Sequence, residues 1–428
     1  MNGGYFDRNL LDPEIAAARF LEVRTRTARL AEPISAEDAQ IQTMPDVSPT
    51  KWHLAHTTWF FETFILKPFV SDHRPYDERF HYLFNSYYEA EGQRHPRPQR
   101  GAITRPNLDE VKAYRAHTER VVLKFLETAA DRNDWSEITA LVDLGCHHEE
   151  QHQELLLTDI KHVLAQNPDW PAYKKDETEP PASSSGRAAG WKEFSGGLME
   201  IGHDGDGFAF DCEGPRHKVY LEDFRLATQL VTNREYLEFI EDGGYERPEF
   251  WLTDGWAMVG AEDWSQPLYW RRNGGRTEFT LHGERPLDPA TPVSHLSLFE
   301  ADAFAAWAGA RLPREEELEL AALSGDPGSP INDLESGALH PRSAPDGTAV
   351  KQLYGDVWEW TQSAYSPYPR FKARPGAVGE YNGKFMCNQY VLKGGSCMTP
   401  RGHCRASYRN FFPPHSRWQC VGLRLARD

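Results

Sequence analysis

Apolar side chains recur at helical spacing over four stretches of the first 165 residues. The predicted helices begin near Ile15, run from Pro49 to Leu66, and span about 108–130 and about 136–164. Pro68 should end the second of them, because proline lacks the amide hydrogen that a continuing helix needs. Four helices with long connections predict a helical bundle over residues 1–166.

The pattern changes in the second half of the chain. Residues 167–190 read NPDWPAYKKDETEPPASSSGRAAG, a composition that cannot bury a core and predicts a linker. After it, short β-like stretches alternate with Gly, Pro and Asn turns, and helices are indicated only near 233–241 and 298–308. We therefore expect residues 191–428 to form an irregular α+β domain.

Charge and hydropathy narrow the range of partners and locations. The chain has 64 acidic and 47 basic residues, a formal charge of −17, which argues against nucleic acid and anionic membranes as partners. No apolar run is long enough to span a membrane, and the N-terminus lacks signal-peptide features, so a cytoplasmic location is expected. Six cysteines without a CxxC pair are expected to be reduced thiols.

The sharpest chemical signal is the run His147–Glu154, which reads HHEEQHQE. His148 and His152 stand four apart, so on a helix they share one face and can converge on one metal ion. A third ligand is needed, and His56 is the first candidate, with His53 one turn earlier as its competitor.

The same run admits other interpretations. His148 to His152 formally matches the H-E-x-x-H pattern of zinc hydrolases, in which Glu149 would be the general base. The glutamates around the histidines could also be a solvated helix face, and a single histidine in a bundle is more often a hydrogen-bonded core residue than a ligand.

A loop between the second and third helices carries the paired Tyr87 and Tyr88, followed by the arginine-rich run RHPRPQRG over 94–101. Its prolines argue against a helix. Arginine suits bidentate carboxylate binding, and a tyrosine could supply a proton. The alternative is a basic surface loop with aromatic packing.

Two sets of motifs resemble known families. GDVWEWT (355–361), VLKGGS (391–396), SYRN (407–410) and VGLRL (421–425) resemble the formylglycine-generating-enzyme/sulfatase-modifying fold. WHLAH (52–56) and the histidine run resemble DinB-like bundles. A DinB-like part followed by a formylglycine-generating-enzyme-like part resembles the non-haem iron sulfoxide synthases of ergothioneine biosynthesis. The implied architecture is a four-helix DinB-like bundle followed by an irregular C-type-lectin-like, formylglycine-generating-enzyme-like domain.

This resemblance implies an activity and an iron site. Iron(II) would be held by His56, His148 and His152, and O2 would drive C–S bond formation between a thiol and the imidazole of trimethylhistidine (hercynine), giving a sulfoxide. Gln151 would hydrogen-bond this substrate. Its trimethylammonium and carboxylate groups would be surrounded by Asn410, Phe411 and Phe412.

The motifs point less directly to the thiol substrate and to the residue that donates a proton. The arginine-rich loop resembles that of cysteine-using members, so cysteine is preferred over γ-glutamylcysteine. Arg97 and Arg100 would contact its carboxylate and Asp46 its amine. Some members use a tyrosine of the C-terminal domain as proton donor, which no motif places around 374–380 here.

Tyr87 and Tyr88 are therefore the predicted catalytic pair. Cys397 and Cys404 do not match the spacing of the formylglycine generators' cysteine pair, which favours a substrate-pocket wall over a copper site. The alternatives are the zinc hydrolase, an ovothiol-type synthase acting on histidine itself, and a non-catalytic binding module.

Overall fold

The chain folds into two compact units. The structure, a computed structural model, describes residues 7–175, 190–205, 207–272, 274–324, 331–345, 347, 349–373 and 377–428. The helical unit comprises Met1–Pro168, His203–Cys212 and Phe371–Lys384; the mixed unit comprises Asp169–Gly202, Glu213–Arg370 and Phe385–Asp428. Two short segments that come after residue 190 therefore belong with the helices. The domain limits near 166 and 190 stay a prediction.

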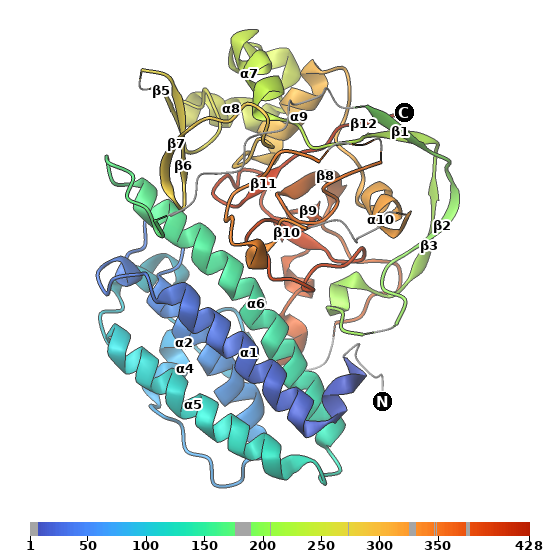
Figure 1. Cartoon of the computed structure of the whole chain (residues 1–428). Coiled ribbons are helices and arrows are strands. Elements are labelled where there is room, and N and C mark those ends of the chain that lie inside the picture. The colour runs from blue at the N-terminus through green and yellow to red at the C-terminus, as the bar shows by residue number, and fades with distance from the viewer. Residues whose placement is uncertain are drawn as a thin grey trace. The chain divides into compact units, whose positions relative to one another are not determined.

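The helical unit is built on the expected four-helix bundle (Figure 1). Its long helices are α1 Pro13–Ala31, α2 Thr50–Phe61, α5 Leu108–Ala129 and α6 Trp135–Ala165, and its shorter elements are η1 Arg8–Leu11, η2 Asp38–Gln40, α4 Arg79–Phe84, η4 Glu89–Glu91, η5 Arg97–Ala102 and η10 Ala377–Glu380. The Asp12 carboxylate caps α1 by accepting the N–H groups of Glu14 and Ile15. Apolar residues of all four long helices, among them Phe20, Phe61 and Val122, form one core.

The close approach of α2 and α6 depends on a glycine. A Cβ at Gly145 would lie 2.6 Å from the ring of Phe61, so any larger residue would push the helices apart. This crossing lies one helical turn before His148.

The predicted end of the second helix before Pro68 is wrong. After α2 the chain continues as a π-helix over Glu62–Leu66 and then as α3, Lys67–Phe69. Lys67 N–H donates to the carbonyl of Glu62, five residues back. Pro68 is the second residue of α3, and the helix ends one residue later at Phe69.

The proline-rich loop and the expected linker are more ordered than their composition predicts. Arg97–Ala102 forms a 3-10 turn rather than irregular loop. Within 167–190, Trp170 and Tyr173 are buried, and Trp170 packs on Phe279 at a ring distance of 5.4 Å. Two aromatic side chains thus hold the described first part of this segment, up to Lys175, against the mixed unit. Residues 176–189 lie outside the described residues.

The mixed unit has the low regularity expected, with short sheets in the orders β1-β4-β12, β10-β9-β8-β11, β2-β3 and β5-β6-β7. The strands are β1 Trp191–Phe194, β2 Gly197–Ile201, β3 His217–Leu221, β4 Phe224–Ala227, β5 Trp270–Arg272, β6 Arg276–Thr280, β7 Gly283–Pro286, β8 Trp358–Ala364, β9 Tyr390–Lys393, β10 Asn410–Phe412, β11 Val421–Gly422 and β12 Ala426–Arg427. The predicted helices appear as α7 Asn233–Glu241 and α9 Leu298–Trp307, and the sequence analysis missed α8 Thr253–Ala261 and α10 Glu315–Ser324. Short 3-10 turns lie at Gly244–Glu246, Pro248–Phe250 and Leu334–Ser336.

A buried ion pair connects the motifs of the mixed unit. Arg424, just after β11, donates to both oxygens of Glu359 in β8, at 2.8 and 3.0 Å. It also donates to the carbonyls of Ala227 and Lys351, so four separate segments meet at one guanidinium. Both side chains are at most 1% exposed. Burial raises the pKa of Glu359, and Arg424 opposes that rise.

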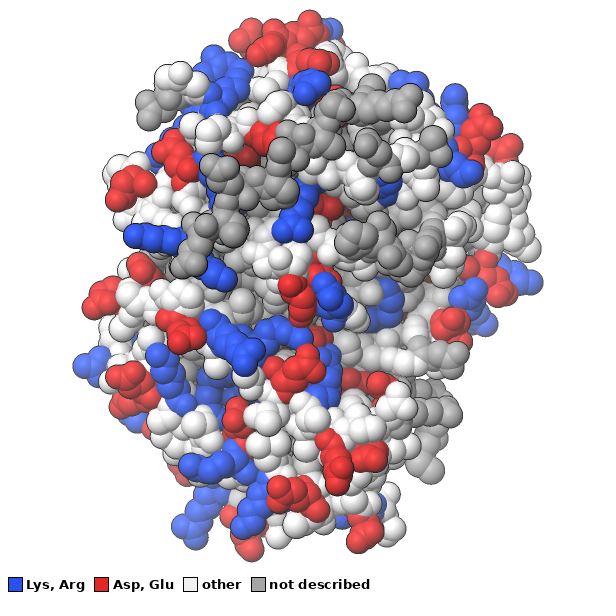
Figure 2. All heavy atoms as spheres, viewed as in Figure 1, with Lys and Arg blue, Asp and Glu red and all other residues white. Residues whose placement is uncertain are grey.

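The surface, the helices and the cysteines add three findings. Figure 2 shows acidic and basic side chains interspersed on the face it draws. Among the described residues, no helix is long and apolar enough to cross a membrane. All six cysteines are free thiols.

We expect Arg424→Met to lower the free energy of unfolding by about 3–5 kcal/mol, because the Glu359 carboxylate would remain buried without its cation. Urea unfolding followed by circular dichroism measures this change. Arg216→Met is the matched control, since its pair with Glu200 is exposed and the substitution should leave the unfolding midpoint nearly unchanged. Equal effects of the two substitutions would contradict the importance of the buried pair.

Candidate metal centre

Three histidine side chains converge between α2 and α6. His56 comes from α2, and His148 and His152 come from consecutive turns of α6. Their ring centroids lie 4.6–5.0 Å apart, and one ring nitrogen of each lies within 4.8 Å of the others. The structure thus brings together the three residues that the sequence analysis named as ligands.

Hydrogen bonding leaves ring nitrogens of this cluster free. Nδ1 of His56 lies 2.6 Å from the carbonyl oxygen of Phe84, which can only accept, so Nδ1 carries the hydrogen and Nε2 carries the lone pair. That Nε2, and both ring nitrogens of His148, are buried without a hydrogen-bond partner in the described part of the chain. Buried polar atoms left unpaired are costly, and a cation at this point would satisfy them.

His53, the competitor of His56, has no free ring nitrogen. Its Nδ1 lies 2.8 Å from Nδ1 of His152, and its Nε2 lies 3.0 Å from Oδ2 of Asp159. His53 therefore lies behind His152 rather than beside it, and the geometry favours His56 as the third donor.

All three imidazoles are held in the neutral form that metal binding requires. Burial lowers the pKa of His148 to about 3, although the neighbouring Glu149 opposes the change. Burial also lowers the pKa values of His56 and His152 well below the usual value, and the other histidines of the cluster add to the effect. Three neutral imidazole donors fit a borderline transition-metal ion such as iron(II).

Glu149 faces away from this cluster. Its two oxygens accept from Arg24 of α1 and Arg115 of α5, both at 2.9 Å, and its side chain is fully buried. Burial opposes ionisation, but the two arginines lower the pKa of Glu149 to about 2. A carboxylate that is paired with two arginines and has such a low pKa is poorly suited to act as the general base of a zinc hydrolase.

The sequence analysis missed Tyr381. This residue follows η10 in one of the two C-terminal segments of the helical unit, and its ring lies 5.5 Å from that of His148. Its hydroxyl donates to Oε1 of Gln151, and its ring stacks on Phe210 of the other segment at 5.4 Å. Tyr381 lies one residue beyond the range 374–380 that the resemblance indicates, and residues 374–376 lie outside the described residues. No local motif marks a residue that reaches the cluster from 230 positions away.

Tyr87 and Tyr88, the predicted catalytic pair, lie in the same unit. Tyr87 packs against Tyr381 at a ring distance of 6.0 Å. Tyr88 is enclosed by aromatic rings, with Trp59 at 5.6 Å and Phe64 at 5.1 Å. Burial raises the pKa values of both phenols. Their catalytic role stays a prediction.

The two arginines assigned to thiol binding differ in environment. The guanidinium of Arg100 is buried, lies 3.4 Å from the centre of the Trp52 ring, and donates to the hydroxyls of Ser48 and Ser86. Among the described residues it forms no ion pair, and burial lowers its pKa. Arg97 is exposed and donates at 2.7 Å to the backbone carbonyl of Asp46.

The other predicted substrate residues form β10 of the mixed unit. Phe411 stacks on Tyr365 at a ring distance of 4.1 Å, and Phe412 lies edge-on to Trp418 at 5.8 Å. Asn410 Oδ1 accepts the N–H of Phe411. Their role in substrate binding stays a prediction.

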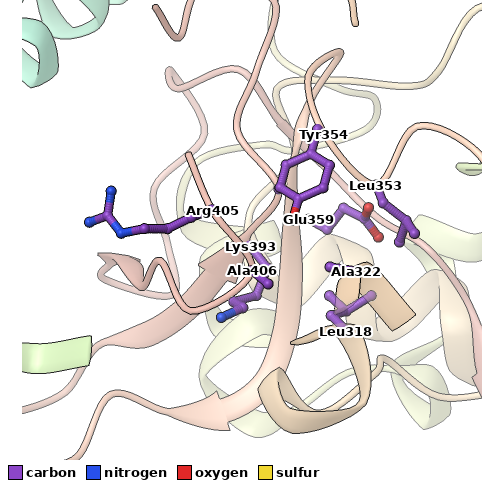
Figure 3. A pocket seen from close by; sticks show the side chains of 9 residues that line it. Leu318, Ala322, Leu353, Tyr354, Glu359, Lys393, Arg405 and Ala406 are labelled. Carbon is purple, nitrogen blue, oxygen red and sulfur yellow. The ribbon is translucent and has the colours of Figure 1, made fainter. Parts of the chain in front are cut away.

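Each unit has a small hollow. That of the helical unit is lined by Leu144, Ala209, Phe210, Asp211, Val378, Tyr381 and Asn382, so it adjoins Tyr381. Figure 3 shows the hollow of the mixed unit, lined by Tyr354, Glu359, Lys393 and Arg405 among others. Its charged groups are already paired, Lys393 with Glu319 and Arg405 with Glu213, so the hollow offers a ligand little unused charge.

Comparison with known families accounts for both halves of the chain. The DinB superfamily matches residues 19–156, and the sulfatase-modifying factor enzyme 1-like domain matches residues 180–345 and 337–428. The predicted fold, a DinB-like bundle followed by a formylglycine-generating-enzyme-like domain, is confirmed. Formylglycine-generating enzyme of Streptomyces coelicolor is 28% identical over 58% of this chain and 92% of its own length. The structure of PvdO from Pseudomonas aeruginosa covers 56% of this chain and 94% of its own, with 19% identity and a TM-score of 0.37.

Other relatives match the chain from end to end. Hercynine oxygenase of Mycolicibacterium smegmatis is 32% identical over 98% of this chain and 99% of its own length. Hercynine oxygenase of Mycobacterium tuberculosis is 30% identical over 98% of this chain and 100% of its own. The resemblance to sulfoxide synthases of ergothioneine biosynthesis is thereby confirmed. The chain belongs to the hercynine oxygenase family, whose members are oxygen-using oxidoreductases.

Proposed function

We propose that this protein is an iron(II)-dependent sulfoxide synthase that uses O2 to join the sulfur of cysteine to the imidazole of hercynine. The observation that carries the proposal is the convergence of the imidazoles of His56, His148 and His152, in which buried His56 and His148 have ring nitrogens without a hydrogen-bond partner among the described residues. The full-length similarity to relatives named hercynine oxygenase supports the choice of substrate.

The overall reaction is balanced without a further reductant. A C–H bond of the imidazole and the S–H bond of the thiol are replaced by a C–S bond, and the sulfur is oxidised to the sulfoxide. One oxygen atom of O2 enters the sulfoxide and the other leaves as water. When bound by the three histidines, iron(II) would supply the redox chemistry with O2 and a positive charge that favours the thiolate.

Gln151 and Tyr381 are placed to orient the acceptor and to move a proton. Gln151 follows His148 by three residues on α6, and its amide NH2 can donate to the hercynine imidazole while its oxygen accepts from Tyr381. The phenol of Tyr381 holds a proton beside the histidine cluster, which suits a donor to reduced oxygen. This assigns to Tyr381 the role predicted for Tyr87 and Tyr88.

Arg100 is the best placed group for the thiol's carboxylate. It is a buried cation without an ion-pair partner among the described residues, and a carboxylate would supply the missing charge. Asp46 could bind the amine, with Arg97 holding the backbone of that residue. Phe411 and Phe412 remain proposed contacts of the trimethylammonium group.

Iron-loaded protein is expected to consume O2 when given hercynine and cysteine, and mass spectrometry should detect the sulfoxide-bearing conjugate. Assays with γ-glutamylcysteine, and with histidine in place of hercynine, test the thiol choice and the ovothiol-type alternative. Zinc-loaded protein is the control, because zinc has no redox chemistry. An iron-loaded sample that consumes no O2 with any substrate pair would contradict the proposal.

Tyr381→Phe should reduce C–S bond formation by ~100-fold, the usual range for loss of a general acid, with little change in hercynine binding. Tyr87→Phe and Tyr88→Phe should have smaller effects on the rate and on the product ratio. Product analysis by mass spectrometry measures all three variants under identical conditions. If Tyr87→Phe or Tyr88→Phe loses most of the C–S bond formation while Tyr381→Phe stays active, the proton donor is one of the tandem tyrosines and not Tyr381.

Arg100→Met should raise the KM for cysteine about tenfold or more, because a charged hydrogen bond to the carboxylate is lost. The KM for hercynine should change little, and the effect of Arg97→Met should be smaller because that side chain is exposed. Arg94→Met is the matched control, since Arg94 is an exposed arginine of the same loop paired with Glu89. Equal KM values for cysteine in Arg100→Met and the control would exclude the assignment.

A further inference from the structure

A hydrogen-bonded chain runs from a buried carboxylate to one histidine of the cluster. Oδ2 of Asp159 lies 3.0 Å from Nε2 of His53, and Nδ1 of His53 lies 2.8 Å from Nδ1 of His152. Asp159 and His53 are each 3% exposed. The chain crosses from α6 to α2 and back to α6, so it also links the two helices that carry the three ligands.

The direction of these hydrogen bonds follows from the groups involved. An ionised carboxylate only accepts, so His53 Nε2 carries a hydrogen. In neutral His53, Nδ1 is then an acceptor, and the hydrogen between the two rings belongs to Nδ1 of His152. The lone pair of His152 therefore lies on Nε2. The opposite direction would put a hydrogen on His152 Nε2 and prevent that atom from binding a metal ion.

We infer that Asp159 and His53 are positioning residues, which fix the tautomer and ring orientation of His152 so that its Nε2 is available to a metal ion. The inference rests on the proposed metal site and extends it to two residues that touch neither substrate nor metal. Such outer partners raise the basicity of a ligating histidine, and their loss commonly weakens metal affinity 10- to 100-fold.

Asp159 has a second contact that decides how it can be tested. Its Oδ2 also accepts the backbone N–H of Ser48 at 2.8 Å, just before α2 begins. Asp159→Asn keeps an acceptor oxygen for Ser48 but removes the charge, so it is a milder change than Asp159→Ala. At position 53, His53→Asn offers an amide oxygen near the place of Nδ1, whereas His53→Phe keeps a ring and offers no acceptor.

The test is the affinity of the full-length protein for Co(II) alone, measured by competition with a chromophoric chelator and by the Co(II) absorption bands. His53→Phe should bind Co(II) ~10- to 100-fold more weakly than the unchanged protein, and Asp159→Asn should also bind it more weakly. His53→Asn should retain more affinity than His53→Phe. Adding Asp159→Asn to His53→Phe should cause no further loss, because Asp159 acts through His53.

His162→Phe is the matched control, because His162 is another largely buried histidine of α6, with Nδ1 2.6 Å from the hydroxyl of Thr43. It should leave Co(II) affinity unchanged. Thermal unfolding checks that each variant is folded, and if His53→Phe is not, the loss in Asp159→Asn relative to His162→Phe decides.

Unchanged affinity in His53→Phe, or losses that multiply in the double variant, would overturn the inference while leaving the proposed metal site intact. If the unchanged protein itself binds no Co(II), both the site and the inference fail. If it binds Co(II) with the expected pattern among variants but forms no sulfoxide when loaded with iron, the proposed activity fails and the inference stands.

Discussion

The geometry of the histidine cluster depends on one buried charge. Glu149 on α6 is ionised by its pairing with Arg24 and Arg115, which come from α1 and α5. The same arginines donate to α2, Arg24 to the hydroxyl of Thr58 and Arg115 to the carbonyl of Leu54. A charge buried this way tolerates no sliding or rotation of α6, because any shift would leave it unpaired. Glu149 thus fixes the register in which α6 presents its histidines to α2.

The short-range parts of this arrangement could be predicted from the sequence. The spacing of His148 and His152 places them on one face of a helix, and the apolar periodicity identifies the helices themselves. The choice between His53 and His56 could not be made in this way, since both lie on α2 one turn apart. It is decided by partners distant in sequence, the carbonyl of Phe84 for His56 and the carboxylate of Asp159 for His53.

The same difference between local patterns and contacts distant in sequence explains where the sequence-based predictions fail. The H-E-x-x-H pattern is a local string, and only the positions of two arginines far away in the chain show that Glu149 is not free. Tyr381 reaches Gln151 across 230 positions without any periodic or motif signal. The helix passes Pro68 through a π-helical turn, which depends on packing and has no sequence signature of its own.

The aromatic ring of Trp52 contacts both a histidine of the cluster and a buried arginine. One of its faces stacks on His56 at 4.5 Å, and its ring also lies under the guanidinium of Arg100. The indole is therefore in contact both with the guanidinium of Arg100 and with one of the three converging imidazoles. An indole suits both contacts, because its π-electrons attract a cation and its flat face stacks on a neutral imidazole.

The two short C-terminal segments of the helical unit, His203–Cys212 and Phe371–Lys384, bear on how such a protein can change over evolution. A gene cut after the fourth long helix would encode the three histidines but neither Tyr381 nor the Phe210 ring on which it stacks. Such a cut therefore divides the helical unit itself, although each half of the chain matches a separate family. An exchange of the first 168 residues alone would therefore leave the helical unit without both segments.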